Sequence, residues 1–199
     1  MTTNFEFYKN MVERTNLDKI FGILAEEIFE TITPEVMPEG IKNTIQKATY
    51  VIIPMVTGIY KKAFLSVYKG EFTDEEFGKL AAFYGPGSTL WSFFNTSDFF
   101  PWLKKTIKGR IQARVEGLDL ASMTTAEFKE LFTINLLLEA LDQLPEWVKT
   151  GSEDYINSDL YRREAALGDK ITAEGDRLTS KVNWYEILEK AGIELPNKD

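Results

Sequence analysis

The chain has 199 residues, of which 44% are hydrophobic and 27% are charged, and its formal net charge at pH 7 is -8. This length and composition suit one main domain with its own core, and the acidic balance argues against general nucleic-acid binding, which normally uses a basic face. Because the sequence contains neither cysteine nor histidine, disulfides, zinc-thiolate sites and Cys- or His-based catalysis are excluded, and we predict neither a cofactor nor a bound metal.

Apolar residues at spacings of three and four predict helices throughout the first part of the chain. The first two helices are expected over residues 4–15 and 16–32, with Asn16 as the N-cap of the second. A longer helix is expected over residues 41–68. Pro54 and Gly58 lie on or near the side opposite its apolar stripe, so we expect a kink near Gly58 rather than two separate helices.

The first residues do not combine a charged start, an apolar run and a small-residue cleavage site, so we expect no signal peptide. The most apolar window covers residues 48–60, about 13 residues, which is shorter than the ~20 that a membrane-spanning helix needs. We therefore expect no transmembrane segment, and a location in the cytoplasm or within an assembly.

A capping box is expected at Thr73, followed by an acidic first turn and by Glu76, whose carboxylate reaches back to the cap. The run EFTDEEF (residues 71–77), followed by AFYGPG (residues 82–87), resembles the signature of a bacterial family of small all-helical proteins of unknown function. It departs from that signature at Phe77, where Leu is usual, and before Pro86, where Ser is usual. The resemblance implies an all-helical fold and assigns no catalytic residue.

Aromatic residues are concentrated in the next two predicted helices, residues 88–94 and 98–116. Exposed members such as Trp91 and Phe94 are interpreted as a partner-binding surface, although they are also consistent with a corner of the core or with a pocket for an apolar ligand. The second helix carries a basic run, which is typical of a solvated face and alternatively of a site for an acidic partner. Its members are Lys104, Lys105, Lys108, Arg110 and Arg114.

Residues 125–144 are apolar around nearly the whole circumference of a helix, which predicts a central helix with the rest of the bundle packed around it. Its narrow polar stripe consists of Asn135, Glu139 and Asp142. Two carboxylates on this stripe could serve as the general acid and base of a hydrolase. The oxygen atoms of the stripe could also be ligands for Ca²⁺ or Mg²⁺. Three groups on one rigid helix converge poorly on an ion, so neither interpretation is preferred.

Composition changes after Gly151, where apolar residues become sparse. We therefore predict a helical domain over residues 1–150 and an extended C-terminal arm over residues 151–199, with one short helical stretch near residues 158–167. The arm ends in a predicted anchor helix over residues 184–191. Its apolar face supplies the remaining predicted partner-binding residues, which are Trp184, Tyr185, Ile187 and Leu188.

These features favour a non-enzymatic structural or adaptor protein that associates with itself or with protein partners. The subunit of a virion or of another multi-subunit complex fits the surplus of aromatic residues and the terminal anchor. Two alternatives from other classes are a carboxylate-dependent hydrolase acting on a polymer such as a glycan, and a carrier of an apolar ligand.

The last expectation concerns an ion pair, because Arg110 and Arg114 fall within the apolar arc of their helix. Pairing of either arginine with Glu139 or Asp142 would offset the cost of burying both charges, whereas the alternative is that the arginines extend past the end of the core. If the pair forms, Arg110→Ala and Glu139→Gln each lower the free energy of unfolding by about 2 to 4 kcal/mol. In chemical denaturation the double variant should lose much less than the sum, and additive losses would contradict the pairing.

Overall fold

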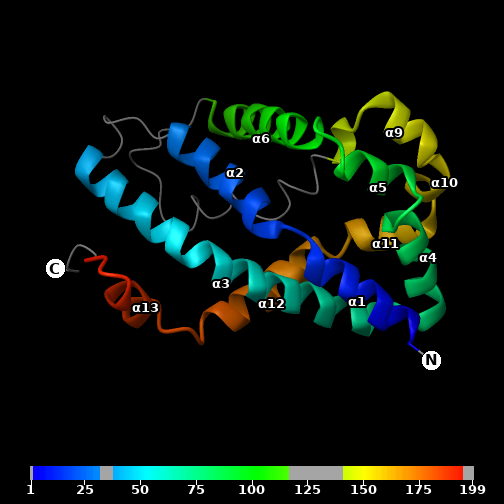
Figure 1. Cartoon of the computed structure of the whole chain (residues 1–199), viewed down its shortest axis with the longest axis horizontal. Coiled ribbons are helices and arrows are strands. Elements are labelled where there is room, and N and C mark those ends of the chain that lie inside the picture. The colour runs from blue at the N-terminus through cyan, green and yellow to red at the C-terminus, as the bar shows by residue number, and fades with distance from the viewer. Residues whose placement is uncertain (1, 32–37, 117–140, 195–199) are drawn as a thin grey trace.

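The computed structural model describes residues 2–31, 38–116 and 141–194. Every regular element among these residues is a helix, so the predicted all-α class is confirmed (Figure 1). The elements are α1 Asn4–Arg14, α2 Leu17–Thr31, α3 Glu39–Glu71, α4 Asp74–Tyr84, α5 Thr89–Phe94, α6 Phe99–Val115, the 3-10 helix η1 Leu141–Gln143, α9 Glu146–Gly151, α10 Glu153–Ile156, α11 Asp159–Ala165, α12 Gly168–Thr179 and α13 Trp184–Lys190.

The longest described helix is α3, which continues for 33 residues through Pro54. Helices α1, α2 and α12 pack along it (Figure 1). The proline removes one backbone donor from the helix interior, and the buried hydroxyl of Thr57 donates to the Pro54 carbonyl at 3.0 Å. The same hydroxyl also donates to the carboxylate of Asp18 on α2. The site of the proline is therefore also a point where α2 is joined to α3.

The predicted N-caps Asn16 and Thr73 are confirmed. Asn16 accepts a hydrogen bond from the backbone N–H of Lys19 at 3.3 Å. Thr73 and Glu76 form both halves of the capping box that begins α4. Asp74, next to this cap, accepts from the backbone N–H of Phe5 at 3.0 Å, so the start of α4 also fixes the start of α1.

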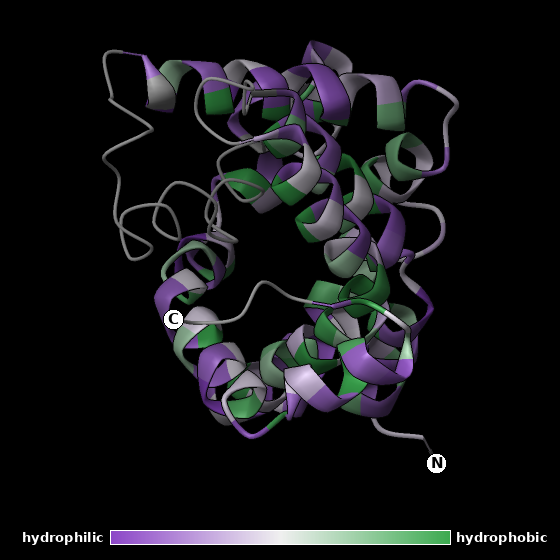
Figure 2. Cartoon of the chain, turned by 90° about the vertical axis from the view of Figure 1, so that its left-hand side faces the viewer, coloured by the Kyte–Doolittle hydropathy of each residue, from purple (hydrophilic) through white to green (hydrophobic). Residues whose placement is uncertain are grey.

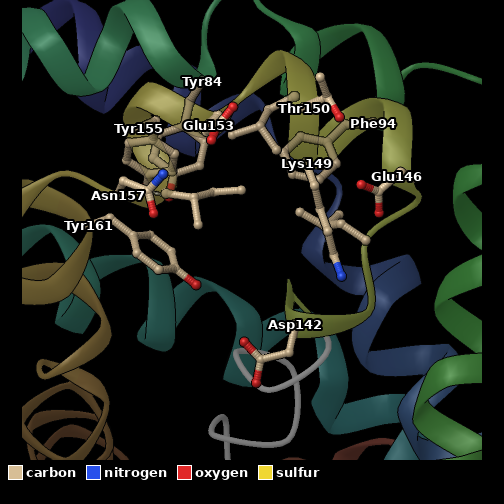
Figure 3. Close-up of a pocket in the computed structure, with 13 residues that line it drawn as sticks. Tyr84, Phe94, Asp142, Glu146, Lys149, Thr150, Glu153, Tyr155, Asn157 and Tyr161 are labelled. Carbon is tan, nitrogen blue, oxygen red and sulfur yellow. Dashed lines mark hydrogen bonds between the residues drawn. The ribbon is translucent and has the colours of Figure 1, made fainter.

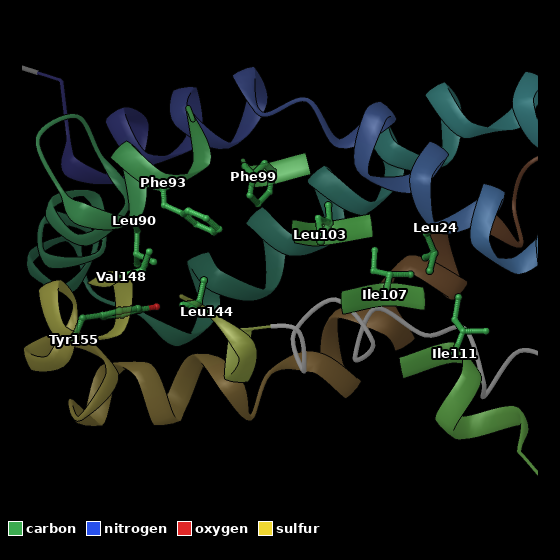
Figure 4. Close-up of a cluster of buried hydrophobic side chains, with 10 residues drawn as sticks. All are labelled: Leu24, Leu90, Phe93, Phe99, Leu103, Ile107, Ile111, Leu144, Val148 and Tyr155. Carbon is green, nitrogen blue, oxygen red and sulfur yellow. The ribbon is translucent and has the colours of Figure 1, made fainter. Parts of the chain in front are cut away.

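Hydrophobic and hydrophilic residues alternate within the turns of most helices (Figure 2), and the hydrophobic ones form three clusters. One cluster joins α2, α5, α6, α9 and α10 (Figure 4) and consists of Leu24, Leu90, Phe93, Phe99, Leu103, Ile107, Ile111, Leu144, Val148 and Tyr155. A second joins α1, α3, α4, α11 and α12 and consists of Tyr8, Leu65, Tyr68, Phe72, Phe77, Leu80, Leu160, Leu167 and Ile171. The third, smaller cluster joins α2 to α3.

The helix predicted over residues 125–144 lies outside the described residues up to residue 140. Its last part, Leu141–Gln143, is a 3-10 helix, and Pro145 then precedes α9. Among the described helices, α3 is the longest, and α1, α2 and α12 pack against it.

The segment from residue 152 to residue 180 differs from the predicted extended arm, because it forms the helices α10, α11 and α12. Helix α12 packs extensively on α3, and its Ile171 is 2% exposed. The apolar residues are few, but they lie on one face and complete the second cluster. The predicted anchor helix is present as α13, with the side chain of Asn183 accepting from the backbone N–H of Glu186.

By length and composition alone, α3 is the one described helix that is apolar enough to cross a membrane, and 17% of its most apolar window is buried. A core helix of a soluble protein meets the same criterion. Helices α1, α2 and α12 pack on α3, but they leave large apolar side chains of this helix exposed, among them Ile41 at 42% and Met55 at 39%.

The close approach of α12 to α3 depends on Gly175, because a Cβ atom there would lie 2.9 Å from the ring of Tyr60. Gly175→Ala should therefore lower the free energy of unfolding by about 1 to 3 kcal/mol, although alanine is the better helix former. Gly109→Ala on α6 is the matched control, since its Cβ would meet no atom within 4 Å, and it should raise stability by about 0.5 to 1 kcal/mol. Urea denaturation measures the free energy of unfolding of both variants. Equal stabilisation by the two would show that a Cβ at position 175 meets the ring of Tyr60 at no cost.

Candidate functional site

A pocket of about 410 Å³ opens where the end of α4 meets α5, η1 and the helices α9 to α11 (Figure 3). Its aromatic walls are formed by Tyr84, Phe94, Tyr155 and Tyr161, and its charged groups are Asp142, Glu146, Lys149 and Glu153. Leu90, Leu144, Thr150, Ile156 and Asn157 complete the lining. The pocket is therefore a mixed site, aromatic on its walls and mainly acidic among its charged groups.

Hydrogen bonds at caps and at a helix crossing position the segments that carry these side chains. The Ser158 hydroxyl caps α11 by accepting from the backbone N–H of Tyr161 at 3.1 Å, and it donates to the carbonyl of Tyr155 at 2.6 Å. Helix α9 approaches α5 at Gly151, whose carbonyl accepts from the Thr89 hydroxyl at 3.1 Å. A Cβ at Gly151 would lie 2.5 Å from that hydroxyl oxygen, so the contact between the two helices requires glycine.

A buried carboxylate lies behind the aromatic wall. Glu164 on α11 is 6% exposed, and Tyr68 on α3 donates to its Oε1 at 2.8 Å. Tyr155 donates to Oε2, and Tyr84 is hydrogen-bonded to Tyr155 and lies 3.4 Å from the same Oε2. Three phenol groups from α3, α4 and α10 thus surround one carboxyl group on α11.

Burial raises the pKa of Glu164 to about 7, although the hydrogen bonds from Tyr155, Tyr68 and Tyr84 act in the opposite direction. The pKa values of Tyr68, Tyr84 and Tyr155 are raised, first by burial and also by their charged neighbour. The tyrosines therefore stay protonated at neutral pH and act as donors to the carboxyl group. Glu164 is the part of this network that titrates near neutrality.

Ring contacts extend the network on both sides. Tyr8 on α1 stacks on Tyr68 with ring centroids 6.0 Å apart, and Tyr84 meets Tyr155 edge to face at 5.3 Å. Tyr155 also meets Tyr161 edge to face at 5.3 Å. The rings of the pocket wall and those of the α1–α3 core are joined through Glu164, which accepts hydrogen bonds from Tyr155 and from Tyr68.

The carboxylates of Asp142, Glu146 and Glu153 are all on exposed residues, and none makes a hydrogen bond or an ion pair with another described side chain. Many other carboxylates of the chain are paired, as Glu76 is with Arg163. Burial raises the pKa of Tyr161, and the negative charge of Asp142 adds to the effect. Among the described lining residues, the open side of the pocket therefore carries a net negative charge, because these three carboxylates outnumber the one ammonium group of Lys149.

The residues predicted to bind partners divide between two places. Trp91 is 37% exposed on α5, and Phe94 on the same helix is half-buried and lines the pocket. Trp184, Tyr185, Ile187 and Leu188 are on α13, at the opposite end of the molecule (Figure 1). Tyr185 is 60% exposed, Leu188 is buried at 5%, and Trp184 and Ile187 are half-buried. Leu188 thus packs within the chain, and no single surface contains all six residues.

The predicted ion pair stays a prediction, because Glu139 lies outside the described residues. Arg110 and Arg114 are half-buried on α6. Asp142 is exposed and belongs to the pocket, where its carboxylate faces Tyr161 (Figure 3). Asn135 also lies outside the described part of the chain.

The basic run of α6 forms ion pairs with α2. Lys104 lies 3.4 Å from the buried Glu27 and 3.8 Å from Glu26, and Lys108 lies 3.6 Å from Glu30. Glu27 raises the pKa of Lys104. These ion pairs connect α6 to α2 and neutralise the charges of two of the five basic residues in the run.

Within residues 2–31, 38–116 and 141–194, no group of three or more acidic side chains is arranged to hold a metal ion. The comparisons with known proteins give no further guide to the site, since no family model, no curated protein and no solved structure matches the chain. The family resemblance, which covers roughly residues 60–95, stays a prediction.

Glu164 and its tyrosine donors were not predicted from the sequence. Tyr68, Tyr84 and Tyr155 are separated by 16 and 71 residues along the chain, and nothing local connects them. The one available signal was Glu164 itself, which occupies a position on the same helical face as Leu160 and Leu167. A charged residue on an apolar face indicates a buried polar contact.

The raised pKa of Glu164 predicts that stability falls with rising pH. Because the folded pKa lies above the unfolded value near 4.5, the stabilisation is complete below pH 4.5 and is lost as the pH rises through about 7. The loss should reach about 3 kcal/mol. With no histidine in the chain, Glu164→Gln should remove most of this pH dependence in denaturation curves between pH 5 and pH 8.

The matched control is Glu153→Gln, which removes one carboxylate from an exposed position of the same region and should retain the dependence. Acid-side losses from Glu76, whose pKa Arg163 lowers, fall below this pH range and do not interfere. A pH dependence that survives unchanged in Glu164→Gln would contradict the assignment.

Proposed function

We propose that the protein is a non-enzymatic binding component of a larger protein assembly, and that the pocket between α5 and α9 to α11 receives a segment of a protein partner. The observation that carries this proposal is the combination of a 410 Å³ cavity, four aromatic walls and an uncompensated acidic side. Binding sites of this kind join apolar walls to a small number of polar groups that fix the orientation of the ligand.

Exposed aromatic residues support recognition of a protein rather than of a small metabolite alone. Trp91 on α5 is 37% exposed and Trp147 on α9 is 50% exposed, and these two helices form one side of the pocket. The ring of Trp147 rests edge to face on Phe93 at 5.9 Å. Tryptophan and tyrosine are enriched in the energetic centres of protein interfaces, so both helices present suitable contact groups around the cavity.

Binding is favoured over the hydrolase because of where the acidic group with a raised pKa lies. A glycan hydrolase needs a protonated carboxyl group that touches the leaving oxygen. Glu164 has a suitable pKa, but Tyr84 and Tyr155 stand between it and the pocket. The carboxylates that do line the pocket are on exposed residues.

A carrier of an apolar ligand is less well supported by the same lining. An apolar ligand would remove water from Asp142, Glu146 and Glu153 without replacing its hydrogen bonds, which is unfavourable. A polypeptide segment can supply polar groups to these carboxylates and apolar groups to the walls. The helix α13 offers a separate contact through Tyr185, as expected for a subunit with more than one neighbour.

A selection from a displayed peptide library tests this function, with the full chain immobilised as bait. Thr150 lies exposed in the pocket lining, so Thr150→Trp should fill the cavity without disturbing the core. Enriched peptides should bind the natural chain and lose at least about tenfold in affinity for Thr150→Trp, which corresponds to about 1.4 kcal/mol.

Glu189→Trp on α13 is the matched control, because it adds the same side chain at an exposed position at the other end of the molecule. Its affinity for the peptides should equal that of the natural chain. Peptides that bind Thr150→Trp equally well, or a failure to enrich any peptide, would count against the proposed function.

A further inference from the structure

We infer that the pocket recognises a cationic side chain, best an arginine, presented by the partner segment. This inference rests on the proposed function and names the chemistry of its ligand. Three observations on the described residues carry it: the balance of charge in the pocket, the aromatic walls, and the state of the hydroxyl groups on those walls.

The balance of charge comes from three carboxylates and one ammonium group. Asp142, Glu146 and Glu153 line the pocket together with Lys149, so two negative charges remain after formal neutralisation. No ion pair within 4 Å joins Lys149 to any of the three in the described structure. A ligand cation would therefore meet carboxylates that already face water, and would not have to break an existing pair.

The walls suit a planar cation in particular. Tyr84, Tyr155, Tyr161 and Phe94 bring their rings to the cavity from four different helices. A guanidinium group stacks on such rings and donates several hydrogen bonds in its own plane. Its flat faces then contact the aromatic walls while its N–H groups reach the carboxylates. An ammonium group would gain the charge attraction with fewer directed hydrogen bonds.

The phenol groups behind the wall strengthen this selectivity. The hydroxyls of Tyr84 and Tyr155 are hydrogen-bonded to each other and to Glu164, which does not line the pocket. These two residues therefore offer ring surface rather than free hydroxyls to a ligand. The face of an aromatic ring attracts a cation, whereas it does not attract an anionic or strongly polar neutral ligand in this way.

The test is a titration of the full chain, followed by NMR, with Nα-acetyl-arginine amide and with Nα-acetyl-citrulline amide. The two probes have nearly the same shape, but only the first is charged. The arginine probe should bind at least about tenfold more tightly, and added salt should weaken it. Equal affinities, or no binding of the arginine probe at tens of millimolar, would overturn the inference.

Two substitutions should change the affinity of the arginine probe in opposite directions. Glu153→Gln should weaken it by about threefold to tenfold, because it removes one carboxylate from the site. Lys149→Gln should strengthen it by about threefold, because it removes the competing cation. Glu189→Gln removes a carboxylate from α13 and should leave the affinity unchanged. A weaker affinity for Lys149→Gln would contradict the charge argument.

The outcomes separate this inference from the proposed function. Pocket-dependent peptides that tolerate replacement of every Arg and Lys by neutral residues would leave the function standing and overturn the cation chemistry. Tighter binding of spermidine than of the arginine probe, combined with failure to enrich peptides, would instead assign the pocket to a free polyamine and overturn both proposals.

Discussion

The structure depends on one buried carboxyl group, that of Glu164, and on the three tyrosines that donate to it. A carboxylate removed from water without partners would cost several kcal/mol, so α11 can pack against the rest of the bundle only where donors are already in place. Tyr68 on α3, Tyr84 on α4 and Tyr155 on α10 provide them. This requirement fixes the position of the C-terminal helices relative to the N-terminal ones more specifically than apolar contact alone.

Features of the chain that are determined locally were predictable from the sequence. Asn16, Thr73 and Asn183 each cap a helix through a residue three positions ahead, and such short spacings are visible in the sequence. The long helix through Pro54 was also predictable, because its apolar stripe continues on both sides of the proline. Burial of one stripe per helix then leads to the all-α class.

The segment after residue 151 was not predictable in the same way, because only part of its buried face is hydrophobic. Glu164, Gly168 and Gly175 lie on that face together with Leu160, Leu167 and Ile171. The glutamate is acceptable only opposite the tyrosines, and Gly175 only opposite the ring of Tyr60. Tyr68 and Tyr84 lie 96 and 80 residues before Glu164, and Tyr60 is similarly far from Gly175 along the chain. The local sequence does not reveal these partners, so its low apolar content predicts an extended arm.

The pocket follows from the same constraint that positions the C-terminal helices. Since the hydroxyls of Tyr84 and Tyr155 are held by Glu164, these side chains cannot rotate into the cavity without leaving the carboxyl group short of donors. The wall is therefore preorganised, and a ligand need not order it on binding. Tyr161 differs, because its hydroxyl makes no hydrogen bond to another described residue and faces Asp142 across the opening. The rigid wall determines the shape of the cavity. The polar groups that are free to orient a ligand lie at the opening, where negative charge predominates.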